Sequence, residues 1–161
     1  DRVTIRRGDA LALPFEPESF DLVWTQHAQM NIVDKATWYR EARRMLKPGG
    51  TFAQWDVAAG SVEPIHFPVP WADNAAISHL ATPDELRRHG EAAGFQVELW
   101  QDRSQDAVAF FERLATAPAG GPPSPLGLQL VVPELATKAA NMRHNLREDR
   151  VRLILGVLRA T

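Results

Sequence analysis

Residues 20–57, FDLVWTQHAQMNIVDKATWYREARRMLKPGGTFAQWDV, hold two strand-like runs with a helical pattern between them. Phe20–Trp24 is short, mostly apolar and bounded by turn residues, which is typical of a strand that is buried on both faces of a parallel sheet. Thr51–Val57 predicts a second strand. A strand, a helix and another strand in this order predict a βαβ crossover, and therefore an α/β fold with a Rossmann-like open sheet.

The helix between these strands has a signal at each end. Asp34 is the predicted N-cap, and apolar residues follow it at helical spacing: Trp38, Ala42 and Met45. Pro48-Gly49-Gly50 should stop the helix, because proline removes a backbone donor and glycine permits a positive φ.

The flanking segments extend the pattern in both directions. Val3–Ile5 predicts the end of a strand, followed by a turn at Gly8-Asp9. Thr82-Pro83-Asp84-Glu85 is a capping box that starts a helix, and Gly94 ends it. Phe95–Trp100 alternates strictly, which predicts an edge or antiparallel strand. The remaining predicted elements are helices over residues 105–116 and 133–148 and a closing strand at Val151–Leu158.

Two segments lack a regular period. Residues 58–81 carry three prolines, at 64, 68 and 70, and their length inside a compact domain predicts a lid or substrate loop. Residues 117–125 are rich in proline and glycine and predict a linker. At 161 residues, the chain is expected to form a single domain over 1–161.

Composition narrows the possible partners. The net charge of -2 and the absence of a basic stripe argue against nucleic acid, and no apolar run approaches the ~20 residues that span a bilayer. The lack of cysteine fits a reducing compartment and predicts a cytoplasmic protein. Three histidines show no metal-ligand spacing, so no metal is expected: His79, His89 and His144.

Several motifs, taken in order, resemble the second half of the class I S-adenosylmethionine-dependent methyltransferases, in the small-molecule, methyltransferase type 11-like branch. The motifs are Gly8-Asp9-Ala10, Leu13-Pro14-Phe15, Phe20–Trp24, Leu46-Lys47-Pro48-Gly49-Gly50, Thr82–Leu86 and Ala93-Gly94-Phe95. The resemblance covers most of residues 3–159. It implies S-adenosylmethionine as the cofactor and a small molecule, with an amine as one candidate, as the methyl acceptor.

The resemblance also implies where ligands bind, because ligands of open α/β sheets lie beyond the carboxyl ends of the strands. Asp9 would accept a hydrogen bond from the adenine amino group, and the backbone of Ala10 would contact the ring. The methionine end of the cofactor would lie against Trp24, Thr25 and Gln26. The expected acceptor-side residues are Gln29 and Asn31 after the strand, His66, Phe67 and Trp71 in the predicted lid, and His27 as the catalytic base.

One departure from the family pattern changes the expectation. The glycine-rich turn after the first strand and the acidic residue that holds the ribose have no counterpart here. The two strands that carry them would lie in the middle of the sheet, so their loss opens a buried edge. We therefore expect a carboxyl-terminal portion of a longer enzyme, incomplete on its N-terminal side and inactive alone because its cofactor site is partial. A homodimer formed by strand exchange is the other expectation.

Simpler interpretations stay open for single residues and for the whole chain. Asp9 can cap its own turn, and the polar residues after Trp24 can satisfy loop backbone. Trp38 and Trp55 can be ordinary core residues. The alternative function is a non-catalytic, methyltransferase-like interaction or scaffold domain. A nicotinamide-dependent doubly wound enzyme is a weaker option, because the motifs at Gly8–Ala10 and Leu46–Gly50 favour the methyltransferase.

Overall fold

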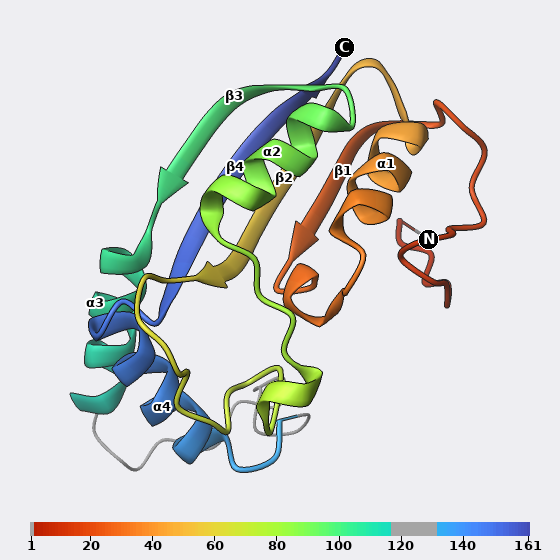
Figure 1. Ribbon diagram of the computed structural model, residues 1–161. Coiled ribbons are helices and arrows are strands. Elements are labelled where there is room, and N and C mark those ends of the chain that lie inside the picture. The colour runs from red at the N-terminus through yellow and green to blue at the C-terminus, as the bar shows by residue number, and fades with distance from the viewer. Residues whose placement is uncertain (1, 117–131) are drawn as a thin grey trace.

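The computed structural model describes residues 2–116 and 132–161, which form an open sheet with helices on both faces (Figure 1). The strands of this described part are β1 (Phe20–Gln26), β2 (Leu46–Ala59), β3 (Phe95–Asp102) and β4 (Val151–Ala160). The α-helices are α1 (Lys35–Met45), α2 (Pro83–Ala92), α3 (Ser104–Thr116) and α4 (Leu135–Arg147). Two short 3-10 helices are η1 (Gln29–Asn31) and η2 (Ala75–Ile77).

The strand order in the sheet is β1-β2-β4-β3. β1 and β2 are parallel and are connected by α1, which confirms the predicted βαβ crossover. β4 lies between β2 and β3 and is antiparallel to both. The predicted α/β class, with an antiparallel strand pair at the carboxyl-terminal end, is therefore confirmed.

The strand predicted at Val3–Ile5 is wrong. Residues 2–8 have no regular structure, and the side chains of Val3 and Ile5 are 77% and 93% exposed. A strand needs a neighbour for its backbone groups and a core for its apolar face. No described strand pairs with this segment, and β1 in turn pairs with β2 alone among the described residues.

Helix α1 begins as predicted but ends earlier. The side chain of Asp34 caps it by accepting from the Thr37 N–H at 2.9 Å. The helix stops at Met45, and Leu46 is already extended because it pairs with Phe20 of β1. The predicted Pro-Gly-Gly stop signal therefore lies inside β2, where Gly49 takes a φ of 75°.

The carboxyl-terminal half follows the sequence closely. Thr82 and Glu85 form the predicted capping box of α2, with Pro83 at its first position. Gly94 follows the helix with a φ of 89°, in the left-handed region that glycine adopts at helix ends. β3 is an edge strand antiparallel to β4, as its alternation predicted.

Helices α1 and α2 cover one face of the sheet (Figure 1). The core beneath them is rich in aromatic rings, with Trp38, Tyr39 and Phe52 packed edge to face at centroid distances of 4.9 to 5.7 Å. Trp38 is therefore a core residue. A second cluster lies on the opposite face, where Val57 and Leu153 of the sheet meet α3 and α4.

The predicted irregular segment at 58–81 is irregular, apart from η2 and one isolated bridge between Val69 and Ala72. Its role as a lid or substrate loop stays a prediction. The predicted linker at 117–125 lies outside the described residues. Within the described ranges, every helix is too short or too polar to cross a bilayer.

Candidate functional site

The carboxyl ends of β1 and β2 lie at the same edge of the sheet, because the two strands are parallel. β1 ends at Gln26, and the chain then turns through His27 and η1 before α1 begins. We call residues 27–32 the tip turn. It lies where ligands of open α/β sheets bind.

His27 leaves the strand with a φ of 51°, in the left-handed region that is uncommon for residues other than glycine. Its backbone N–H donates to the carbonyl of Trp55 at 3.0 Å, which ties it to β2. Desolvation by the surrounding protein lowers the pKa of the His27 imidazole. A neutral ring at pH 7 can accept a proton from a substrate, as a general base must.

Asp56 supports the tip turn from β2. Its Oδ1 accepts from the N–H groups of Ala28 at 2.8 Å and Gln29 at 3.3 Å. The side chain is fully buried, and burial raises the pKa of Asp56 to about 6. Its Oδ2 has no hydrogen-bonding partner in the described part of the chain. Asp56 was not predicted as a site residue, although a carboxylate near the end of an otherwise apolar strand is a signal that the sequence contains.

Lys35, the first residue of α1, supports the same turn from its other side. Its Nζ donates to three backbone carbonyls, those of Gln29, Ile32 and His79, the last at 2.7 Å. Burial lowers the pKa of Lys35 to about 8, and the charge of Asp56 opposes that shift. A buried amine in this position was not predicted.

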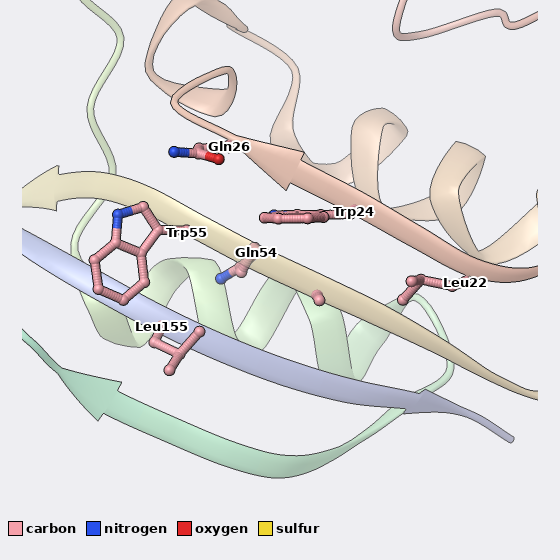
Figure 2. Close-up of a pocket in the computed structure, with 7 residues that line it drawn as sticks. Leu22, Trp24, Gln26, Gln54, Trp55 and Leu155 are labelled. Carbon is pink, nitrogen blue, oxygen red and sulfur yellow. The ribbon is translucent and has the colours of Figure 1, made fainter. Parts of the chain in front are cut away.

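A hollow lies beside this turn on the face of the sheet away from α1 (Figure 2). β1 contributes Leu22, Trp24 and Gln26, which share a face because strand side chains alternate. Trp24 is 68% exposed. Thr25 projects from the opposite face of the strand. The remaining lining residues are Ala53, Gln54, Trp55 and Leu155. Trp55, expected as core, is half-buried at the wall of this hollow.

Asp9 and Ala10 do not line the hollow. The side chain of Asp9 accepts from the Leu11 N–H at 2.9 Å, so it caps its own turn, and Ala10 packs against the core on the α1 side. No described strand carries Asp9 to the edge where β1 ends, so its contact with the cofactor stays a prediction.

The two polar residues predicted in η1 differ in placement. Gln29 is fully buried, and its side-chain amide donates to the carbonyl of Val57 at 2.5 Å. It therefore supports the tip turn from within. Asn31 is exposed at the end of η1 and is free to face an acceptor.

The predicted lid residues lie in a segment that α4 holds firmly. The Asn145 side chain accepts from the His66 N–H at 2.8 Å and donates to the His66 carbonyl at 2.9 Å. The imidazole of His66 lies 2.8 Å from Glu148. Phe67 is half-buried, and Trp71 donates to Ser78 while packing against the cluster that contains Met30 of η1.

This segment also reaches the tip turn directly. The backbone N–H of His79 donates to the carbonyl of Met30 at 2.8 Å, and the His79 carbonyl accepts from Lys35. The tip turn, the irregular segment and α4 thus form one connected unit. Within the described residues, no three His, Asp or Glu side chains are grouped so that they could hold a metal ion.

Comparison with known proteins agrees with this fold. Residues 1–54 match a family model described as a methyltransferase domain. The chain is 31% identical over 113 residues to a dimethylglycine N-methyltransferase from Parasynechococcus marenigrum (strain WH8102), covering 70% of this chain and 40% of that protein. It is 30% identical over 109 residues to a 27-O-demethylrifamycin SV methyltransferase from Amycolatopsis mediterranei (strain S699), covering 65% of this chain and 40% of that protein.

Among solved structures, the fold matches geranyl diphosphate C-methyltransferase from Streptomyces coelicolor A3(2), in complex with Mg2+, geranyl diphosphate and S-adenosyl-L-homocysteine. The TM-score is 0.72 at 16% identity, over 97% of this chain and 52% of that one. This likeness concerns the fold alone. The chain spans about half the length of the solved structure and 40% of the length of the two curated relatives.

Proposed function

We infer that the chain belongs to the class I S-adenosylmethionine-dependent methyltransferases, and we propose that it takes part in methyl transfer from S-adenosylmethionine to a small-molecule acceptor, with an amine as the first candidate. The observation that carries the proposal is the tip of β1. There, a neutral His27 and an exposed Asn31 follow Gln26, which lines a hollow together with Trp24 and Trp55 of a parallel strand pair.

The residues present fit part of the donor. Trp24 and Trp55 border the hollow, and their ring faces can stabilise a sulfonium by cation–π contact, worth roughly 0.5–2 kcal/mol. Gln26 offers an amide to the polar methionine end. Asp9 and Ala10 stay the proposed adenine contacts by family likeness. The chain has no counterpart of the family's glycine-rich turn or ribose-binding acid, so the proposed site is partial.

Bound S-adenosylmethionine would supply a methyl group on a positively charged sulfur, which becomes a thioether as the methyl leaves. The protein's part is to position the acceptor and to manage its proton. An amine must lose its proton before its lone pair can bond to the methyl carbon, and the neutral His27 ring can take that proton. Asn31, Phe67 and Trp71 are the proposed walls of the acceptor pocket, and His66, whose imidazole lies 2.8 Å from Glu148, is a further proposed acceptor-side residue.

Calorimetric titration of the full-length gene product with S-adenosylhomocysteine tests the proposal. We expect saturable binding, and Trp24→Ala should weaken it, whereas Ile77→Ala, which removes another exposed apolar side chain, from η2, should not. A full-length product that binds neither S-adenosylmethionine nor its demethylated form would contradict the proposed enzyme. It would favour the non-catalytic scaffold instead. A cytoplasmic location is also proposed, and cell fractionation tests it.

A further inference from the structure

The tip turn is held in a conformation that its own sequence does not favour. A non-glycine residue in the left-handed region, such as His27, costs on the order of 1 kcal/mol or more and persists only where the surroundings fix it. Three successive N–H groups of the turn, those of His27, Ala28 and Gln29, are engaged by β2, through the Trp55 carbonyl and the Asp56 carboxylate. The donors of the turn are thus fixed on one side.

The acceptors of the turn are fixed on the other side by Lys35. Its ammonium binds the carbonyls of Gln29 and Ile32, and the His79 carbonyl adds the irregular segment to the same point. A cation in the first turn of a helix opposes the helix dipole, and its burial costs further free energy. General stability therefore does not explain why a lysine stands here.

Asp56 is equally poor as a stabilising residue. Asp56 is fully buried, which costs free energy for a charged group. Its Oδ2 has no hydrogen-bonding partner among the described residues. Apolar side chains in place of a buried pair of charges are often neutral or stabilising. Within the part of the chain that the structure describes, the Asp56 carboxylate and the Lys35 ammonium form no direct ion pair. Instead, the tip turn lies between them, bound to one through its N–H groups and to the other through its carbonyls.

We propose that Asp56 and Lys35 are positioning residues that clamp the tip turn between opposite charges, so that His27 and Asn31 are presented to the methyl acceptor. The inference rests on the proposed function for its chemistry and on the hydrogen bonds above for its geometry. The Lys35 ammonium also binds the His79 carbonyl, so it joins the tip turn to the irregular segment. These two segments carry the residues proposed to contact the acceptor.

The clamp should depend on pH. The titratable groups around Asp56 are Lys35 and Tyr39 on α1 and His27 in the turn; His79 of the irregular segment faces Lys35 through its backbone. When the carboxylate takes up a proton, it loses its attraction for Lys35 and accepts more weakly from Ala28 and Gln29. The turn should therefore loosen as the pH falls through about 6, where the pKa of Asp56 lies.

Amide NMR of the full-length gene product tests the clamp without any need for activity. The Ala28 and Gln29 amide shifts should titrate with a midpoint near the Asp56 pKa of about 6 in the unmodified protein and in His27→Asn. The titration should vanish in Asp56→Asn, and it should persist in Asp21→Asn, which changes an exposed carboxylate at the other end of β1. Titration that survives in Asp56→Asn, or that is absent from the unmodified protein, would overturn the proposal.

Kinetics test the consequence for catalysis. We expect Asp56→Asn and Lys35→Met to lower kcat by about tenfold to a hundredfold, because a small misplacement of reacting groups is costly. The dissociation constant of S-adenosylhomocysteine should stay within about threefold, because the donor is not bound by the clamp. Lys35→Arg, which keeps the charge and the donors, should recover part of the lost rate. If Lys35→Met does not fold, Lys35→Arg against Lys35→Gln gives the same comparison.

The two hypotheses fail in different ways. A protein that does not bind S-adenosylhomocysteine contradicts the proposed function, yet the amide titration still decides whether the clamp exists. A protein that binds it, but whose kcat is unchanged in both clamp variants, contradicts the positioning role and leaves the methyltransferase assignment intact.

Discussion

At the scale of single residues, the proposed base gives the most direct test. His27→Asn should lower the rate of amine methylation at pH 7 by about a hundredfold, the lower end of what a general base contributes. His144→Asn on α4, an exposed histidine remote from the tip turn, should leave the rate unchanged. Initial rates measured with radiolabelled donor compare the two. Equal rates in both variants would show that solvent takes the proton.

The pKa of Asp56 predicts a pH dependence of stability. Its pKa rises from 3.8 to about 6 on folding, so the folded state holds the proton more tightly than the unfolded chain. The free energy of unfolding should therefore fall as the pH rises from about 4 to about 6, by up to about 3 kcal/mol, and then level off. Asp56→Asn removes this contribution.

Urea unfolding at pH 4.5, 6 and 7 measures the effect, with each pH value chosen to bracket the Asp56 transition. The difference in unfolding free energy between the unmodified protein and Asp56→Asn should change steeply between pH 4.5 and 6 and much less from 6 to 7. A difference that does not vary with pH would contradict the raised pKa. Lys35 does not interfere, because its pKa of about 8 lies above this range.

The Asn145 side chain attaches the irregular segment to α4 through two hydrogen bonds with the backbone of His66. Asn145→Ala removes the hydrogen-bonding partner of the His66 N–H and carbonyl, which are part-buried, and this should cost about 1–3 kcal/mol in total. His144→Ala, at the neighbouring exposed position, is the matched control. Thermal unfolding measures both. A melting temperature unchanged by Asn145→Ala would mean that water replaces the side chain.

At the scale of elements, Gly90 sets how closely α2 approaches the sheet. A Cβ at this position would lie 2.6 Å from Cδ2 of Leu158 in β4 and 3.5 Å from the Tyr39 ring. Gly90→Ala should therefore destabilise the protein by about 1–3 kcal/mol, although alanine is the better helix former by about 1 kcal/mol. Arg88→Ala, at an exposed position of the same helix, serves as the control, and chemical denaturation reports both.

The elements were predicted unequally well, for a physical reason. The start of α2 was predicted to within one residue, because a capping box depends only on hydrogen bonds between residues that are close in the sequence. The end of α1 was misplaced by two residues, because pairing of Leu46 with β1 takes the chain into the sheet before the Pro-Gly-Gly signal is reached. Val3–Ile5 does not form the predicted strand, because no described strand pairs with it.

At the scale of the whole molecule, an exposed sheet face and a free edge stand out. Leu22 and Trp24 are 53% and 68% exposed on β1, and the outer edge of β1 has no described partner. Parallel sheets are normally covered on both faces. We therefore expect the 161-residue chain, prepared by itself, to self-associate in the way that the predicted strand-exchange homodimer requires.

Light scattering coupled to size exclusion measures this association. Trp24→Lys should shift the chain towards the monomer, because it places a charge on the face that would be covered. Ile77→Lys, on an apolar side chain that is 50% exposed in η2, should have no effect. A chain that is monomeric at all concentrations would rule out association through this face.

The sequence by itself determined the local and the repetitive features: the βαβ unit, the capped helices, the edge character of β3 and the place of the polar tip after β1. These depend on periodicity and on contacts between near neighbours in the chain, which a sequence shows directly. Only the tertiary structure decided what supports that tip. Asp56, Lys35 and Asn145 act on backbone groups of segments up to 79 residues away, and no local pattern states which distant carbonyl or N–H a buried polar group will meet.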